Sequence, residues 1–144
     1  MIRAKKSLGQ NFLIDKNIIE KIINITNIEN KIVLEIGPGT GSLTSFILKK
    51  KPKKVFVIEK DTELAINLKD KFNNQLIIVN DDVLKIDETN LFNNKVIVFG
   101  NLPYNISTEI LTKWIINLKD KFWFESLILM FQKEVADRIV AELN

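Results

Sequence analysis

The chain has 144 residues, a hydrophobic content of 46% and a formal net charge of +3, which suits one globular domain and is too short for two ordinary ones. It contains no cysteine and no histidine, which excludes disulfides, thiolate metal sites, a cysteine nucleophile and histidine acid–base catalysis. No apolar run approaches the roughly 20 residues that a membrane-spanning helix needs, and the amino-terminal residues show no signal-peptide pattern. Any chemistry must use carboxylates, amides, hydroxyls, the backbone and a bound cofactor.

The first predicted element is a helix over residues 15–26, with Asp15 as its N-cap and isoleucines at helical spacing after it. The next elements are a strand, a helix and a second strand, over residues 31–36, 42–50 and 55–59. A helix that carries Leu64, Leu68 and Phe72 on one face then leads to a third strand over residues 76–80.

The second half of the chain continues this alternation. A strand, a helix, a fifth strand and a closing helix are predicted over residues 95–100, 107–118, 126–131 and 133–143. The apolar stripe of the helix at 107–118 is Ile110, Leu111, Trp114 and Ile115. Strands that are apolar throughout and separated by helices are typical of a parallel sheet covered on both faces. The sequence therefore predicts a doubly wound α/β sheet, whose ligands bind beyond the carboxyl ends of the strands, where the strand order reverses.

A glycine-rich turn follows the first predicted strand. Residues 35–41 are Glu-Ile-Gly-Pro-Gly-Thr-Gly, and glycines between a strand and a helix let a ligand approach the backbone and the amides of the helix N-terminus. The spacing matches neither the dinucleotide fingerprint nor the phosphate-binding loop. The turn therefore favours a ligand other than a pyrophosphate.

Acidic residues follow the next two strands. Glu59 ends the second strand, about twenty residues after the glycines, where a carboxylate can accept both hydroxyls of a ribose. Asp81 and Asp82 follow the third strand, where an acid can accept a hydrogen bond from the exocyclic amine of adenine. Together with the glycines they predict a nucleoside pocket; ordinary surface acids are the alternative interpretation.

The fourth strand runs into Asn-Leu-Pro-Tyr-Asn-Ile-Ser at residues 101–107. Asn101 supplies an amide oxygen, a proline fixes the turn, and Tyr104 offers a flat face on which a base can stack. An adenine amine is a poor nucleophile because its lone pair is delocalised into the ring. Acceptors at the Asn101 side chain and the Leu102 carbonyl would hold its two hydrogens after the base leaves its stack. Asn101, Leu102 and Tyr104 are therefore the predicted catalytic residues.

These residues resemble the family of ribosomal RNA adenine dimethyltransferases. The resemblance covers nearly the whole chain, at residues 7–13 (SLGQNFL), 35–44 (EIGPGTGSLT), 57–61 (VIEKD), 99–107 (FGNLPYNIS) and 130–141 (MFQKEVADRIVA). It implies a Rossmann-like fold that uses S-adenosylmethionine to dimethylate two adjacent adenosines near the 3′ end of small-subunit rRNA. It implies that these residues bind the cofactor: Asn11, Leu13, Gly37, Gly39, Glu59, Asp82 and Asn101. Within this set Glu59 would hold the ribose hydroxyls and Asp82 the adenine.

The resemblance also implies partners and a domain organisation. Residues 1–144 would be one cofactor-binding domain, made of an amino-terminal segment (1–30) and an α/β core (31–144). The partner would be rRNA in a precursor of the 30S particle, and we expect a cytoplasmic monomer with no membrane contact and no metal. Family members continue with two further strands and a small helical RNA-binding domain, so the chain is expected to be truncated after the fifth strand and to lack that domain.

Several alternatives remain open. The erythromycin-resistance methyltransferases of large-subunit rRNA are also similar in the Gln-Asn-Phe and Asn-x-Pro-Tyr motifs, although the Gly-Pro-Gly-Thr-Gly turn and Leu102 resemble the small-subunit type. A non-catalytic, cofactor-binding ribosome-assembly factor is a second alternative, and a methyltransferase of DNA adenine or protein glutamine a third. Lys5 and Lys6 are candidates for phosphate contact, whereas the lysine run at residues 49–54 is expected to be a solvated surface.

Overall fold

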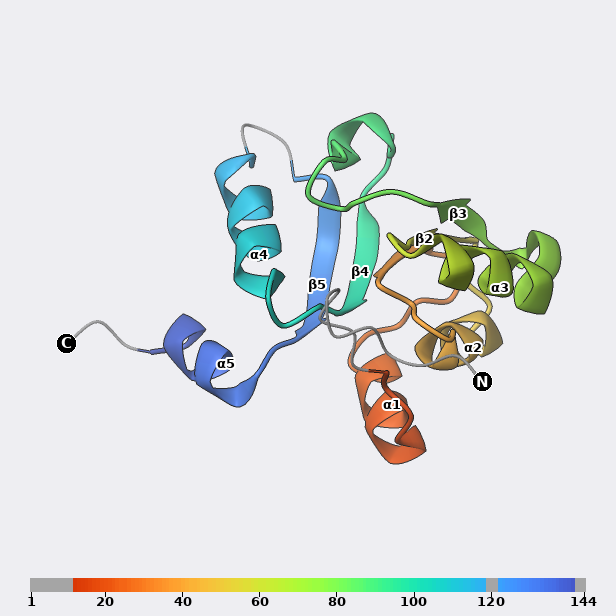
Figure 1. The fold of residues 1–144 in the computed structure, drawn as a ribbon, viewed down its shortest axis with the longest axis horizontal. Coiled ribbons are helices and arrows are strands. Elements are labelled where there is room, and N and C mark those ends of the chain that lie inside the picture. Colours follow the sequence, from red (N-terminus) through yellow and green to blue (C-terminus); the bar gives the residue numbers. More distant parts are fainter. Residues whose placement is uncertain (1–11, 119–121, 142–144) are drawn as a thin grey trace.

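The computed structural model describes residues 12–118 and 122–141. In these residues five strands form one sheet in the order β3-β2-β1-β4-β5, and every neighbouring pair is parallel. The strands are β1 (Ile32–Ile36), β2 (Lys54–Ile58), β3 (Ile77–Val79), β4 (Val96–Asn101) and β5 (Phe124–Met130). The predicted doubly wound α/β sheet is therefore confirmed (Figure 1).

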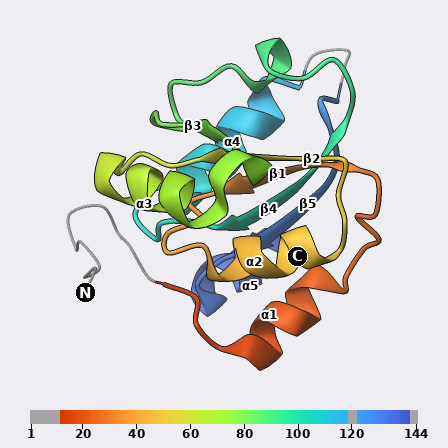
Figure 2. The ribbon, with the colours of Figure 1, turned by 90° about the vertical axis from the view of Figure 1, so that its right-hand side faces the viewer.

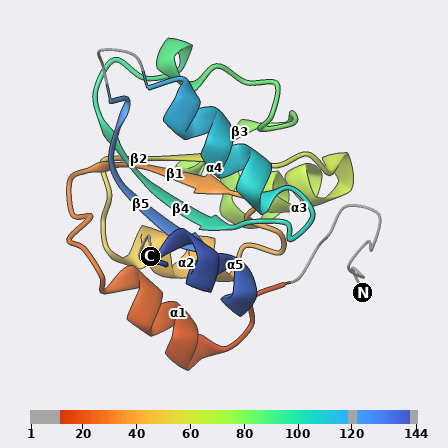
Figure 3. The same ribbon diagram turned by 90° about the vertical axis from the view of Figure 1, so that its left-hand side faces the viewer.

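Helices cover both faces of the sheet. They are α1 (Lys16–Ile23), α2 (Ser42–Lys49), α3 (Thr62–Phe72), α4 (Ser107–Ile116) and α5 (Lys133–Ile139), with short 3₁₀ turns η2 (Asn73–Gln75) and η3 (Glu88–Asn90). Figures 2 and 3 show α1 and α2 on one face and α4 on the other. Among the described residues no helix is long and apolar enough to cross a bilayer.

Each face of the sheet has its own apolar cluster. Ile23 of α1 and Ile47 of α2 pack with Phe99 of β4 on one face. Ile110 and Trp114 of α4 pack with alternate residues of the same strands on the other face. Because α1 contributes to the first cluster, this helix is part of the same packed unit as the sheet.

The helices begin in two different ways. Asp15 caps α1, as predicted, and accepts hydrogen bonds from the amides of Asn17 (2.9 Å) and Ile18 (3.3 Å). In contrast, the N-cap of α2 is Gly41, whose φ of +79° lies in the left-handed region. A Cβ atom there would lie 2.5 Å from the ring of Phe72. The missing side chain therefore lets the start of α2 pack directly on the end of α3.

The structure corrects some predicted details. The first helix ends at Ile23 instead of residue 26, and α4 ends at Ile116 instead of residue 118. The prediction that Ile115 belongs to the apolar stripe of α4 is wrong, since 55% of its surface is exposed. Ile110 and Trp114 face the sheet, and the next residue is turned about 100° away from it by the helical repeat. The closing helix ends at Ile139.

We predict that Gly41→Ala destabilises the fold more than Gly37→Ala does. Both glycines have positive φ, so an alanine costs about 1–2 kcal/mol at either position. Only at Gly41 does the new Cβ overlap an aromatic ring, which adds about 1–3 kcal/mol. Urea denaturation of the two variants measures the difference, and equal losses of unfolding free energy would contradict the tight packing of α2 on α3.

Candidate functional site

The strand order reverses between β1 and β4. These two strands are neighbours, with Ile36 of β1 level with Gly100 of β4. The chain leaves β1 toward α2 on one face and leaves β4 toward α4 on the other (Figures 2 and 3). In doubly wound sheets such a switch point opens a crevice beyond the strand ends, and Gly37 and Asn101 stand on its two sides.

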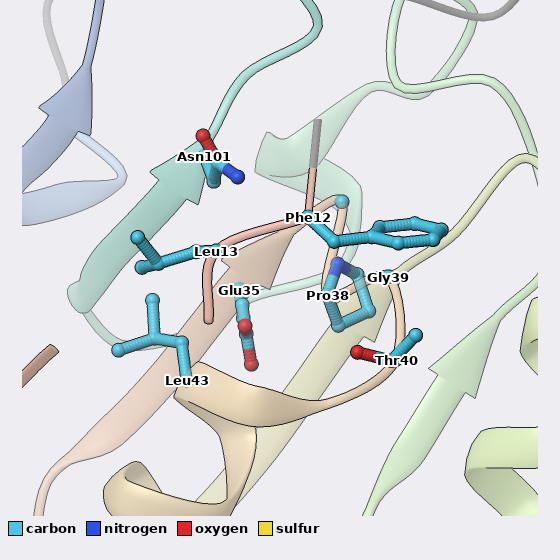
Figure 4. Close-up of a pocket in the computed structure, with 9 residues that line it drawn as sticks. Phe12, Leu13, Glu35, Pro38, Gly39, Thr40, Leu43 and Asn101 are labelled. Carbon is cyan, nitrogen blue, oxygen red and sulfur yellow. The ribbon is translucent and has the colours of Figure 1, made fainter. Parts of the chain in front are cut away.

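A small pocket, open to solvent, lies at this switch point. Its lining combines the segment before α1, the turn after β1, the first turn of α2 and the end of β4 (Figure 4). The lining residues are Phe12, Leu13, Glu35, Gly37, Pro38, Gly39, Thr40, Leu43 and Asn101. Four of the predicted site residues are thus brought together: Leu13, Gly37, Gly39 and Asn101.

The amino-terminal segment lies against the glycine turn. A Cβ atom added to Gly39 would lie 3.0 Å from the ring of Phe12, and one added to Gly37 would lie 3.5 Å from the carbonyl oxygen of Asn101. Figure 4 shows the ring of Phe12 beside Pro38 and Gly39. The turn therefore offers bare backbone to a narrow space between Phe12 and the end of β4.

Glu59 stands directly after β2 and is only 6% exposed. Its carboxylate accepts hydrogen bonds from the amides of Asp61 (2.9 Å) and Gly39 (3.3 Å). Burial raises its pKa above the ordinary value, and these two hydrogen bonds oppose the rise. Each carboxylate oxygen keeps a further lone pair, so a carboxylate in this position can also accept ligand hydroxyls. Glu59 is adjacent to the pocket but does not line it.

Asp82 lies at the same edge of the sheet, after β3. The Lys60 ammonium donates to its Oδ2 atom at 2.8 Å, and the Leu84 amide donates to Oδ1 at 3.0 Å. The hydrogen bond from Lys60 holds the pKa of Asp82 below its ordinary value. The acid predicted to accept from adenine is therefore ionised and oriented, but it lies outside the pocket itself.

The predicted catalytic residues occupy different depths of the turn after β4. Asn101 lines the pocket, whereas the side chain of Leu102 is 1% exposed and anchors the turn in the cluster under α4. Tyr104 is 41% exposed, and the amide of Ile106 closes the turn by donating to the carbonyl of Pro103 at 3.1 Å. The turn therefore holds one polar side chain in the pocket and an exposed aromatic ring that is not part of the pocket lining.

Glu35 is a pocket residue to which the sequence analysis assigned no role. It is 1% exposed and accepts a hydrogen bond of 2.7 Å from the hydroxyl of Thr44. Burial, reinforced by the nearby charge of Glu59, raises its pKa from 4.5 to about 7 although the Thr44 bond acts in the opposite direction. The pocket therefore contains a carboxyl group that titrates near neutral pH.

Four further lining residues had no predicted role: Phe12, Pro38, Thr40 and Leu43. The signal for Phe12 was its place in the Gln-Asn-Phe-Leu motif, whereas Leu43 required the orientation of α2. The predicted residues Asn11, Lys5 and Lys6 lie outside the described residues.

The run of lysines at residues 49–54 is exposed and precedes β2, at the end of the sheet opposite the pocket. In the described part of the chain no group of three or more acidic side chains is placed to hold a metal ion.

The sheet order, the glycines after β1 and the polar turn after β4 define a Rossmann-like methyltransferase fold. The family model described as ribosomal RNA adenine dimethylase matches residues 1–144. The chain belongs to the ribosomal RNA adenine dimethylase family.

Individual relatives agree with this assignment. The chain is 65% identical, over 99% of its length, to the ribosomal RNA small subunit methyltransferase A of Pelagibacter ubique. A dimethyladenosine transferase structure from Plasmodium falciparum is 34% identical, with a TM-score of 0.76 over 92% of this chain and 47% of that one. The structure of the 23S rRNA methyltransferase ErmE is 28% identical, with a TM-score of 0.74 over 88% of this chain and 50% of that one. The chain spans about half the length of the curated relatives, 55% for the Pelagibacter protein.

We predict that Glu35 makes the fold less stable as the pH rises. The pKa of the Glu35 carboxyl is near 4.5 in the unfolded chain and near 7 in the folded one. Between these pH values the folded protein still binds a proton that the unfolded chain has released, so the free energy of unfolding falls by about 3 kcal/mol as the pH rises through this range. Glu35→Gln keeps an acceptor for Thr44 and removes the titration. Urea denaturation should show that the free energy of unfolding of the parent, relative to that of Glu35→Gln, falls by about 2–3 kcal/mol between pH 5 and pH 8. If the stability of Glu35→Gln changed with pH in the same way as that of the parent, the raised pKa would be contradicted. Glu134→Gln on α5 serves as the control and should behave like the parent.

Proposed function

We propose that the protein uses S-adenosylmethionine to dimethylate the exocyclic amines of two adjacent adenosines near the 3′ end of small-subunit rRNA. The observation that carries the proposal is the position of Asn101, which lines the pocket together with the glycine turn after β1. A side-chain amide there stands where a cofactor on the turn and a base at the strand end would meet.

The residues of the site fit this cofactor. The glycine turn leaves backbone open where a Cβ would fill the space beside Phe12, and this part of the pocket suits the methionine end. Glu59 suits the ribose hydroxyls and Asp82 the adenine amine, and Leu13 suits a contact from the segment before α1. The acidic edge formed by Glu35, Glu59 and Asp82 also complements a ligand that carries positive charge.

The chain positions the target amine by hydrogen bonds and stacking. When bound, S-adenosylmethionine supplies a methyl group on a positively charged sulfur, which is a strong electrophile. The side-chain oxygen of Asn101 and the carbonyl of Leu102 accept the two amine hydrogens, so the nitrogen lone pair points toward the cofactor. Tyr104 stacks on the extruded base and offsets the loss of its neighbours in the RNA. The amine becomes acidic only after it has attacked, so its proton can leave to solvent and the mechanism needs no histidine.

The small-subunit target is favoured over the large-subunit one by similarity. The curated relatives at 65% and 48% identity are named small subunit methyltransferases, whereas the 23S enzyme is 28% identical. We further propose that residues 1–144 act as the cofactor-binding domain of a cytoplasmic protein that meets its rRNA in a precursor of the 30S particle.

The proposed activity is tested by methyl transfer from labelled cofactor. Unmodified small-subunit particles should accept up to four methyl groups, two on each adenosine, whereas large-subunit particles and duplex DNA should accept none. Labelling of the large subunit alone would replace the proposal with the erythromycin-resistance type of activity. Cofactor binding without transfer to any substrate would favour an assembly factor.

We predict that Asn101→Ala lowers the rate of methyl transfer at least about 100-fold, as expected for the loss of one acceptor that orients the reacting group. Cofactor affinity should fall far less, because the glycine turn and Glu59 are unchanged. Single-turnover transfer and calorimetric binding separate the two effects. Asn74→Ala in η2 is the matched control, and full activity of Asn101→Ala would refute the assigned role.

We predict that Tyr104→Ala raises the KM for the RNA substrate about tenfold or more, because stacking one base on an aromatic ring contributes about 1–3 kcal/mol. Tyr104→Phe keeps the flat face and should remain near the parent. Steady-state kinetics with small-subunit particles measure both variants. A loss of cofactor binding with an unchanged KM for RNA would contradict the stacking role.

A further inference from the structure

A buried ion pair lies outside the pocket, between α4 and the connection that joins β3 to β4. The Lys113 ammonium is 2.8 Å from Oε1 of Glu88, and their side chains are 16% and 4% exposed. The indole nitrogen of Trp114 donates to the same oxygen at 2.7 Å. Lys113 also donates to the backbone carbonyls of Val83, at 2.6 Å, and Ile86.

All the acceptors of Lys113 belong to one segment, the connection between β3 and β4 at residues 80–95. Apart from the short η3 turn this connection is irregular, so it lacks the internal ladder that satisfies carbonyls in a helix or strand. Val83 itself is 5% exposed and packs in the cluster under α4. In Figure 3 the connection, in green, passes close to α4. Lys113 therefore fastens this connection to α4 at three points.

The same connection contains Asp82, the acid assigned to the adenine ring. The carboxylate of Asp82 accepts from the Leu84 amide, and the Asp82 carbonyl accepts from the Lys85 amide at 2.9 Å. These bonds make the direction of the carboxylate depend on the backbone of residues 82–85. Lys113 holds that backbone at Val83, the residue next to Asp82.

The same lysine is carried by the helix that follows the catalytic turn. Helix α4 begins at Ser107, where the Asn-Leu-Pro-Tyr-Asn-Ile-Ser motif ends. Buried charge pairs contribute little net stability compared with apolar residues of the same size, because removing the charges from water offsets their attraction. Hydrogen bonds to two carbonyls and a carboxylate do, however, fix direction, which apolar contacts do not.

We propose that Lys113, with Glu88 as its counterion, is a positioning residue that sets the orientation of Asp82 for recognition of the cofactor's adenine amine. The proposal rests on the cofactor assignment made above. It adds that selectivity for the adenine ring is supported from α4, through the ammonium group of Lys113 and the carbonyl of Val83.

The test compares two product analogues that differ at the amine. S-adenosylhomocysteine has it, and S-inosylhomocysteine carries an oxygen instead. The parent protein should bind the first about tenfold more tightly or better, as expected for a hydrogen bond to a charged acceptor. Lys113→Met should bring the ratio of the two affinities to within about twofold of one. Lys31→Met removes an exposed ion pair with Glu125 at the far end of the sheet and should keep the parent ratio.

A second variant separates the positioning role of Lys113 from a loss of stability. Lys113→Met leaves Glu88 buried and unpaired, whereas the double variant Lys113→Met/Glu88→Gln has no isolated charge and keeps an acceptor for Trp114. The double variant should also lose the preference for the adenine analogue. A general weakening of the fold would lower both affinities together and leave their ratio intact, which would overturn the positioning role while the proposed function stands. A parent that binds both analogues equally would overturn the inference alone, and a parent that binds neither would overturn the proposed function with it.

Discussion

The site depends on the hydrogen-bonded position of β1 between β2 and β4. Ile36, the last residue of β1, is level with Ile58 on one side and Gly100 on the other. The chain therefore leaves three neighbouring strands at one edge, and Gly37, Glu59 and Asn101 follow at almost the same height. A slip of one residue in either ladder would turn every side chain of that strand to the opposite face, and the apolar clusters on both faces prevent this.

Charge is distributed unevenly around this edge. The acidic groups Glu35, Glu59 and Asp82 gather there, and backbone amides, a hydroxyl and one lysine serve as their partners. The lysine run lies at the other end of the sheet. This edge therefore gathers acidic side chains in a chain whose net charge is +3, so net charge alone gives no guide to the ligand of the pocket.

The fold followed from local patterns in the sequence. The apolar runs predicted all five described strands, and Asp15 marked the first helix because an N-cap acts on the residues directly after it. The site was predicted in part, since the residue after a strand must lie at the sheet edge. Contacts between distant segments carried no such signal. The ring of Phe12 against Gly39, the raised pKa of Glu35 and the bond from Lys113 to Glu88 each depend on burial that only the folded chain defines.

The carboxyl group of Glu35 can bind or release a proton in the pocket near neutral pH. With a pKa of about 7, this group is divided between its neutral and ionised forms at neutral pH, in a chain that has no histidine to act in the same range. A positively charged ligand in the pocket favours the ionised form, so its binding expels a proton, whereas a neutral ligand of the same shape expels fewer. The spent form of a sulfonium cofactor is neutral at sulfur. Under the function proposed above, exchange of the spent cofactor for the fresh one therefore releases a proton, and mild alkalinity favours it.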